Sequence, residues 1–414
     1  MATASRYRHI DGGLDKAVEQ AERYGFHDMF IVDIDCHVSE PFSSFSNYLP
    51  EKFKKEYSNA KILEETERYK EDYRIFTGES IDNVDPVKLK LLKLYYEAND
   101  FQPRRYFDFR QGGRIMRTEI KENHLRGMKA DEVVDTFVNR MHDIGIKKSV
   151  IFPGTLLGMG HHPDKNFEVA TSNAFTDYML DEFLDKYPEL LSCLLVPANS
   201  PDKAAELIDR VGSEKGIVGA MITAHRPTLA GNESWSPIYE AATKKNLPIC
   251  FHASQTYVPP YDQFKSILPF YSLAFPFNII LQLTSLVTEG IPVRFPKLKF
   301  VFIEGGITWI PWIMHRLDSM YMMMMSEAPL LKKMPSEYIR EFYFSSQPLE
   351  RPHKNRSDLE QYFKSFDAET QLMYASDYPH FDFDVPSVIY NLPFLTDQAK
   401  KNILGENAKK LFRL

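Results

Sequence analysis

Four segments that read as buried strands end in side chains able to bind a metal ion. Burying an unpaired carboxylate is costly or forces the group neutral, so these acids need a partner. A divalent cation supplies one and also holds a neighbouring imidazole in its neutral form. The residues are Asp35 and His37 at the first strand end, and His252, Glu304 and Asp377 at three later ones. Together they predict a metal centre.

Each of these residues has another explanation when it is taken singly. An aspartate at a strand end often caps the next helix, and a lone buried histidine often makes a structural hydrogen bond. Four strand ends of the same kind are harder to explain that way. In FIVDIDCHVSEP (30–41), strand alternation puts Asp33, Asp35 and His37 on one face. We expect Asp35 and His37 to bind the metal, and the deeper Asp33 to be a hydrogen-bonding group of the core.

Eight short apolar runs alternate with stretches of helical periodicity. The runs are residues 30–37, 147–153, 190–198, 217–223, 247–253, 298–306, 341–346 and 371–377. The helical stretches are 131–143, 166–187, 202–212, 235–245, 272–289, 306–326 and 396–412. Unbroken apolar strands between helices are typical of a parallel sheet, and eight of them favour an α/β fold of the (β/α)8 TIM-barrel type. All strands of such a barrel open on one face, where distant residues converge.

One long segment breaks this alternation. Residues 42–130 are charged and rich in tyrosine, and they follow the first strand directly. We expect a largely helical insertion there, a lid or subdomain that contacts substrate or forms an oligomer interface. Residues 1–29 are then an N-terminal extension, and 30–414 form the metal-dependent barrel.

Composition excludes several classes of protein. The net charge of −7 gives no broad basic surface for nucleic acid. The chain has no apolar run of membrane-spanning length and no signal-peptide core at its start. Its three cysteines are few and far apart, as expected of buried free thiols. These features favour a cytoplasmic enzyme that acts on a small molecule.

The strand-end motifs resemble those of the amidohydrolase superfamily. The similarity is to its amidohydrolase-related branch, which includes aminocarboxymuconate semialdehyde decarboxylase. DIDCHVSEP looks like the branch's D-x-D-x-H-x-x-E-P opening. FPG, WSPIYEAATKKNLPICFHAS, FPKLKFVFIEGGITWIPWIMHRLD and YASDYPHFD follow in the family's order. The resemblance covers residues 30–41 and about 131 onward, and it implies the same barrel.

The resemblance also implies a ligand set. Asp35 stands at the first position of the family's H-x-H pair and His37 at the second, while His252 and Asp377 match the ligands on strands five and eight. Glu304 replaces a histidine common on strand six. No lysine ends strand four, so a second ion would need bridges from other residues, such as Glu40. His380 is a further candidate for a second metal or for the substrate.

The cofactor implied is a divalent metal ion, one or two per chain. Histidines with several carboxylates suit zinc, iron or manganese, and the extra oxygen donors shift the expectation towards iron or manganese.

Several reactions fit such a site. We expect first a metal-dependent hydrolysis of a small carboxylate, amide or lactone, in which Asp377 is the general base and acid for a metal-activated water. Non-oxidative decarboxylation and oxygenation at two iron or manganese ions use the same residues, and a catalytically silent partner subunit is a fourth possibility. Four residues in strand-end loops could orient an anionic substrate: His161, His162, His225 and Arg226. The resemblance implies a homo-oligomer, a dimer or larger, and a homologous partner subunit is also compatible.

Overall fold

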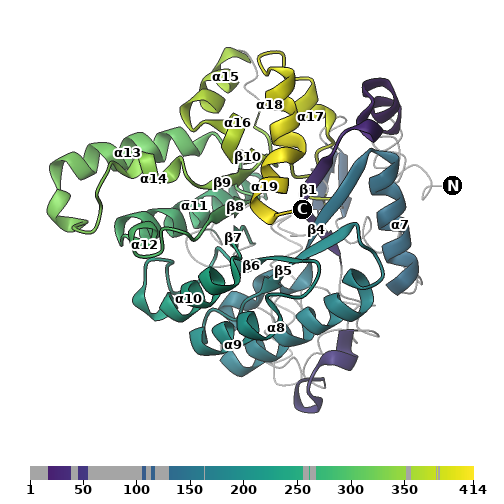
Figure 1. Cartoon of the computed structure of the whole chain (residues 1–414), viewed down its shortest axis with the longest axis horizontal. Helices are drawn as coiled ribbons and strands as arrows, with labels where there is room; N and C mark the ends of the chain where they lie inside the picture. The colour runs from purple at the N-terminus through teal and green to yellow at the C-terminus, as the bar shows by residue number, and fades with distance from the viewer. Residues whose placement is uncertain are drawn as a thin grey trace.

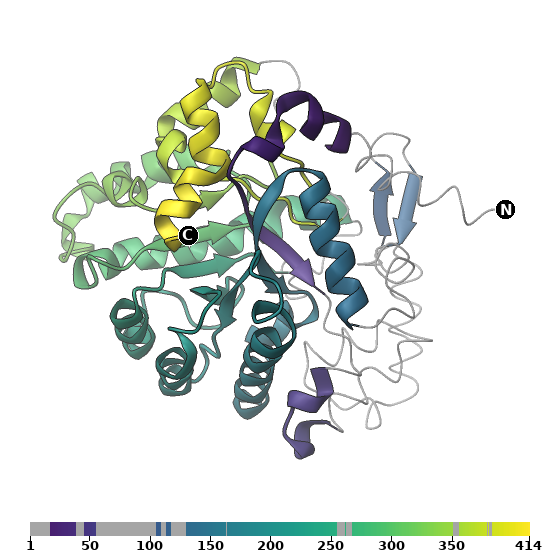
Figure 2. The same cartoon turned by 45° about the vertical axis from the view of Figure 1, so that its right-hand side comes forward.

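The computed structural model describes most of the barrel. The described residues are 17–38, 45–54, 105–108, 113–116, 130–162, 164–254, 261, 267–350, 356–378, 380 and 383–414. Most of the predicted 42–130 insertion and Glu40 lie outside these ranges. Within the insertion, β2 (Arg105–Asp108) and β3 (Gly113–Met116) pair antiparallel in a sheet of their own. Figure 2 brings this hairpin, which the sequence did not predict, into view.

Eight parallel strands form the main sheet, as predicted (Figure 1). They are β1 (Ile31–Val38), β4 (Ile146–Pro153), β5 (Leu190–Leu195), β6 (Ile217–Thr223), β7 (Ile249–His252), β8 (Phe300–Ile303), β9 (Tyr343–Ser345) and β10 (Leu372–Met373). Each of them pairs with the next along the chain. The sheet follows the simple order of a (β/α)8 barrel.

The barrel closes through the segment that follows β10. Ile34 donates its backbone N–H to the Tyr374 carbonyl at 3.0 Å, and His37 donates to Tyr378 at 2.8 Å. In return, Asp377 donates to the Asp35 carbonyl at 2.7 Å. The first strand and the last strand end are therefore held together at the site.

Helices surround the strands in the order predicted (Figure 1). They are α7 (Ala130–Asp143), α8 (Lys165–Met179), α9 (Pro201–Val211), α10 (Ser236–Lys245), α11 (Ile267–Thr288), α12 (Ile291–Arg294), α13 (Trp309–Met323), α14 (Pro335–Ile339), α15 (Arg356–Ser365), α16 (Ala368–Gln371), α17 (Ser387–Tyr390), α18 (Asp397–Lys401) and α19 (Asn407–Phe412). None of the helices in the described ranges has the length and apolarity needed to span a bilayer.

Local sequence accounts for these helices. The Asp164 side chain caps α8 by accepting the Asn166 N–H at 2.8 Å. On α9, Ala204, Leu207, Ile208 and Val211 form the i, i+3, i+4, i+7 stripe that faces the sheet, and all four are buried. Helix α8 continues as a π-helical turn, η6 (Leu180–Leu184).

The interior is one continuous apolar core. Every residue of β1, β5 and β6 is buried, as expected for strands covered on both sides. The three cysteines are free and buried, which confirms the expectation from their spacing. The described polar groups that remain buried in this core therefore need specific partners.

Candidate metal centre

Strand β1 delivers Asp35 and His37 together, as its alternation predicts. Both side chains are fully enclosed. His37 Nδ1 lies 2.9 Å from the Pro153 carbonyl, which can accept only from a protonated nitrogen. That contact leaves Nε2 as the atom that His37 could offer to a metal ion. Its Nε2 lies 3.4 Å from Asp35 Oδ1.

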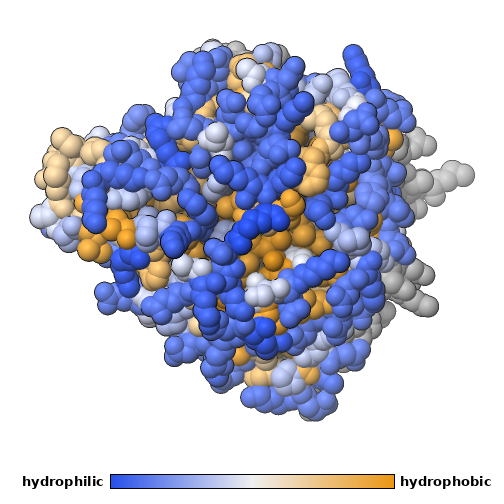
Figure 3. Space-filling view, in the orientation of Figure 1, coloured by the Kyte–Doolittle hydropathy of each residue, from blue (hydrophilic) through white to orange (hydrophobic). Residues whose placement is uncertain are grey.

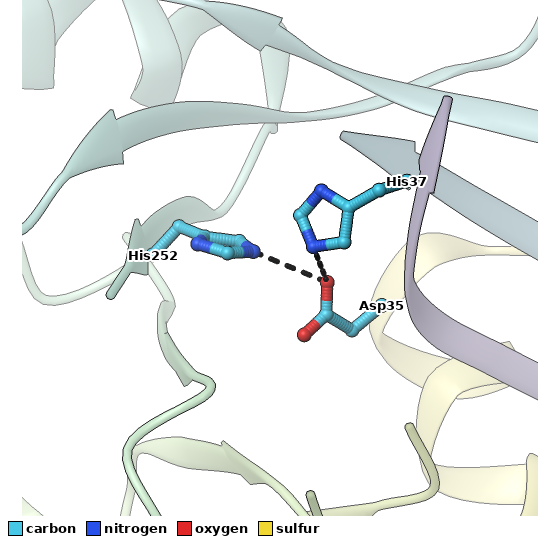
Figure 4. A group of neighbouring side chains, drawn as sticks. All are labelled: Asp35, His37 and His252. Carbon is cyan, nitrogen blue, oxygen red and sulfur yellow. Dashed lines mark hydrogen bonds and ion pairs between the residues drawn. The ribbon is translucent and has the colours of Figure 1, made fainter. Parts of the chain in front are cut away.

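His252 reaches the same carboxylate from the end of β7 (Figure 4). Its Nε2 lies 3.1 Å from Asp35 Oδ1, and its Nδ1 lies 2.6 Å from the Ala253 carbonyl. Both imidazoles are thus fixed by a backbone carbonyl on one nitrogen and present the other to Asp35. This outer support is the arrangement that orients histidine ligands in metal sites.

Asp377 enters from the segment after β10, in a left-handed backbone conformation with φ of 58°. Its Oδ1 lies 3.1 Å from His37 Nε2 and 2.5 Å from His380 Nδ1. Its Oδ2 accepts a hydrogen bond from Gln347 Nε2 at 3.2 Å. The His380 ring also stacks on His37, with ring centroids 4.4 Å apart. Asp377 is therefore held by three neighbours.

The donor atoms form two overlapping groups suited to one cation. Asp35, His37 and His252 offer ligand atoms within 4.8 Å of one another, and so do His37, Asp377 and His380. Both groups depend on His37 Nε2, a single nitrogen with one lone pair. Asp35 Oδ2 is buried and accepts no hydrogen bond from the described residues. A cation would satisfy this oxygen, so the residues fit the metal that the motifs imply.

Glu304 lies on the far side of His252. Its Oε2 is 3.6 Å from His252 Nδ1, the nitrogen that faces away from Asp35. Its backbone has φ of 62° and donates to Ser345 Oγ at 2.9 Å. Glu304 and Asp377 thus both hold a strained, left-handed conformation at strand ends that form the site. In this arrangement Glu304 faces a histidine and is not part of either donor group.

Asp33 is a buried hydrogen-bond acceptor below the centre, as expected. Its Oδ1 accepts the backbone N–H groups of Asp35 at 3.1 Å and Ser376 at 2.8 Å, and its Oδ2 accepts from Ser376 Oγ at 2.5 Å. Burial raises the pKa of Asp33 to about 7, although these hydrogen bonds oppose the rise. Asp33 ties β1 to the segment that carries Asp377.

Charge also shapes the metal-free site. Burial alone lowers the pKa of His252, but the charge of Asp35, its hydrogen bond and the charge of Glu304 raise that pKa to about 9. Without a metal, His252 is therefore an imidazolium paired with Asp35 at neutral pH. A bound cation has to displace this proton.

The predicted substrate residues are placed differently. Arg226 is buried and its Nη1 donates to Glu168 Oε1 at 2.8 Å, so its charge is already neutralised. His162 is buried against Phe167, and its Nδ1 accepts the Asp164 N–H at 3.1 Å. His225 is half-buried in the loop after β6. The His161 side chain lies outside the described residues.

Two residues of the site were not predicted from the sequence. Gln347 holds Asp377, and Ser376 binds Asp33. Gln347 stands just past the seventh strand, in EFYFSSQP, so the strand-end rule would have found it. Neutral amides and hydroxyls give a weaker signal than carboxylates and histidines, because they are tolerated in many loops.

A parallel barrel that gathers histidines and aspartates at its strand ends defines a metal-dependent barrel enzyme. The amidohydrolase family model matches residues 140–414, well over half of the chain. The chain belongs to the amidohydrolase family. None of the curated proteins compared with the chain matches it.

Solved structures share the fold at low sequence identity. A dihydroxybenzoic acid decarboxylase from Polaromonas, with bound manganese and 2-nitroresorcinol, is 15% identical, with a TM-score of 0.59 over 93% of this chain and 97% of its own. 5-Carboxyvanillate decarboxylase from Sphingomonas paucimobilis is 17% identical, with a TM-score of 0.62 over 93% and 99%. An amidohydrolase from Mycobacterium avium is 18% identical, with a TM-score of 0.62 over the same shares.

Proposed function

We propose that the protein is a metal-dependent decarboxylase of small hydroxylated aromatic carboxylates. The observation that carries the proposal is the Asp377–His380 pair, a buried 2.5 Å contact between a carboxylate and an imidazole next to the Asp35, His37 and His252 donors. Decarboxylation needs a proton delivered to carbon and no water. Hydrolysis, which the motifs first favoured, needs a water molecule activated by a base. The similar solved decarboxylases support the same reaction.

Asp35, His37 and His252 would hold the cation, with Asp377 beside them. A divalent ion there would bind the substrate carboxylate with its neighbouring oxygen and stabilise negative charge as a Lewis acid. One ion per chain is our proposal, because both donor groups share a single nitrogen. Manganese is the proposed metal, since it suits mixed carboxylate and imidazole donors and is bound in the Polaromonas enzyme.

The chain's own residues would then carry the proton. Asp377 transfers the proton that it shares with His380 to the ring carbon bearing the carboxylate. The bond between this carbon and the carboxylate breaks, its electron pair returns to the ring, and carbon dioxide leaves. Gln347 keeps Asp377 oriented through Oδ2, and His380 returns a proton to it for the next turnover. The site residues are nearly inaccessible to solvent, which limits competing attack by water.

Carbon dioxide release from the manganese-loaded protein tests this function. We expect turnover of 2,6-dihydroxybenzoate or 5-carboxyvanillate, and no hydrolysis of amides or lactones. His380→Asn should lower kcat by about a hundredfold or more, the usual contribution of a proton-transfer group, while the manganese content stays unchanged. Hydrolysis of these compounds without carbon dioxide release would show that the protein is a hydrolase instead. Oxygen uptake with two irons per chain would favour the oxygenase.

We also propose that the chain forms a homodimer through the side of the barrel formed by α11 and α13. All nine exposed large apolar side chains of the described residues lie between positions 229 and 330: Leu229, Phe277, Leu281, Trp312, Met322, Met323, Met324, Met325 and Leu330. At roughly 200 Å² per residue and half exposure, they present on the order of 900 Å². Each partner of a standard interface buries about 800 Å².

A further inference from the structure

A second group of buried polar side chains lies beside the metal centre. We call it the Thr223 cluster, and it consists of Thr223 at the end of β6, Arg226 in the loop that follows, and Glu168 in the first turn of α8. All three side chains are more than nine-tenths buried. Each of them has one polar atom that makes no hydrogen bond with the described residues: Thr223 Oγ1, Arg226 Nε and Glu168 Oε2.

Thr223 faces the same interior as the metal ligands. In the parallel register of β6 and β7, Thr223 pairs with His252 and Met221 pairs with Cys250. Two residues earlier than Met221, a Cβ placed on Gly219 would meet the sulfurs of Cys193 and Cys250. Positions 219, 221 and 223 therefore share the face on which His252 projects. The Thr223 hydroxyl points into the barrel mouth one strand away from His252.

The backbone of Gly160 lies close to this hydroxyl. It belongs to the turn η5 (Thr155–His161), and Asn199 Nδ2 donates to its carbonyl at 2.9 Å. A Cβ on Gly160 would lie 2.6 Å from Thr223 Oγ1 and 3.2 Å from Arg226 Cγ. Any larger residue at position 160 would clash with the hydroxyl and displace it.

The charge of the cluster defines what it can bind. Arg226 and Glu168 form an ion pair at 2.8 Å with both side chains buried, so the cluster carries no net charge to attract a carboxylate. Its three remaining atoms are one hydroxyl, one N–H donor and one carboxylate acceptor. They complement a neutral group that both donates and accepts, which is a hydroxyl or a carboxamide.

We infer that the Thr223 cluster is a specificity subsite for a neutral hydroxyl of the substrate, distinct from the groups held at the metal. This inference rests on the proposed decarboxylase function and extends it to the substrate class. Thr223 is the residue that contacts this hydroxyl, and the Arg226–Glu168 pair forms the polar wall behind it. Gly160 is a positioning residue, because its lack of a side chain lets the turn η5 lie against Thr223 and Arg226.

A pair of inhibitors that differ by one hydroxyl tests the inference. The probes are 2-nitroresorcinol and 2-nitrophenol, whose dissociation constants are measured by calorimetry on manganese-loaded protein. We expect the wild type to bind 2-nitroresorcinol about tenfold more tightly, the effect of one neutral hydrogen bond. Thr223→Val should reduce this ratio to about one, and Thr223→Ser should restore it. Gly160→Ala should weaken the binding of 2-nitroresorcinol more than that of 2-nitrophenol.

The controls separate this inference from the proposed function. Thr288→Val, a matched change on α11, should leave the ratio at the wild-type value. If Thr223→Val leaves the ratio of the two dissociation constants unchanged, the hydroxyl binds only ordered water and the inference is overturned. A wild type that binds both probes equally also overturns it. If carbon dioxide release persists in either case, the proposed function stands. Failure to take up manganese or to release carbon dioxide overturns both.

Discussion

At the scale of single residues, the site depends on how two histidines are fixed. His37 and His252 each place Nδ1 on a backbone carbonyl, so that both Nε2 atoms face Asp35. The grouping of these side chains could be predicted because carboxylates and histidines at four strand ends of one parallel barrel converge on the same face. The orientation of their rings could not, because it depends on the carbonyls of Pro153 and Ala253 in the folded chain.

Replacing His37 tests the shared ligand directly. We expect His37→Ala to lower the manganese content of purified protein to less than about a tenth of one ion per chain, because both donor groups lose their common nitrogen. Elemental analysis measures the content. His315→Ala, at an exposed position of α13, is the control and should bind metal normally. Full metal occupancy in His37→Ala would contradict this ligand set.

The raised pKa of His252 predicts how metal affinity depends on pH. In the metal-free protein this pKa is about 9, so the imidazole is protonated at pH 7 and the metal competes with a proton. The apparent affinity for manganese should rise about tenfold per unit between pH 7 and 9, with one proton released per ion. Calorimetry in buffers of different ionisation enthalpy measures both quantities. An affinity that stays flat over this range would show that His252 is neutral before binding.

The raised pKa of His252 also makes the stability of the metal-free protein fall as the pH rises, whereas the metal affinity increases. The pKa of His252 is raised from 6.5 in the unfolded chain to about 9 in the folded one. Its contribution to the free energy of unfolding is therefore complete below pH 6.5 and is lost as the pH rises through 9. In denaturant titrations, the chelator-treated protein should have a lower free energy of unfolding at pH 9 than at pH 6.5. The His252→Asn variant is the control and should show a smaller difference between the two pH values.

At the scale of elements, the fold was largely readable from the sequence. All eight strands and seven helical stretches were predicted, because unbroken apolar runs and 3.6-residue periodicity differ clearly. Helices α12 and α14 to α17 were not predicted. The last strand was predicted as 371–377, but only Leu372 and Met373 pair with β9. Tyr374, Asp377 and Tyr378 make backbone hydrogen bonds to β1 instead. This change of pairing partner from β9 to β1 closes the barrel. It has no local signal in the sequence, because it depends on contacts between residues more than 300 positions apart. The Arg226–Glu168 pair, whose residues are 58 positions apart, likewise has no local signal in the sequence.

The C-terminal helical turn η10 (Asn402–Glu406) holds this closure in place. Its Ile403 carbonyl accepts the Tyr374 N–H at 2.8 Å, and a Cβ on Gly405 would lie 1.8 Å from the Phe30 carbonyl oxygen. We expect Gly405→Ala to lower the free energy of unfolding by about 2–3 kcal/mol, the cost of overpacking a rigid backbone contact. Chemical denaturation measures it. Lys401→Ala, an exposed change one turn earlier, should be nearly neutral, and equal stability of the two variants would contradict this packing.

At the scale of the whole molecule, one side of the barrel is unlike the rest. Helix α11 carries no charged residue in its 22 positions, although an outer barrel helix is usually amphipathic. Phe277 and Leu281 lie one turn apart on it and are exposed. Figure 3 shows apolar surface at the end of the molecule formed by α13 and α14, and also in the middle of this face. Exposed apolar area of this kind marks an interaction surface.

A second copy of the chain is the partner that we expect on this side. Light scattering after size exclusion should give twice the mass of one chain for the wild type. Leu281→Glu with Trp312→Glu should give the mass of a monomer, because two buried charges without partners cannot be accommodated at the centre of an apolar interface. Lys409→Glu, at an exposed position of α19, is the control and should leave the mass unchanged. A monomeric wild type would show that the chain does not form this dimer. A dimer that persists after the double substitution would show that the interface lies elsewhere.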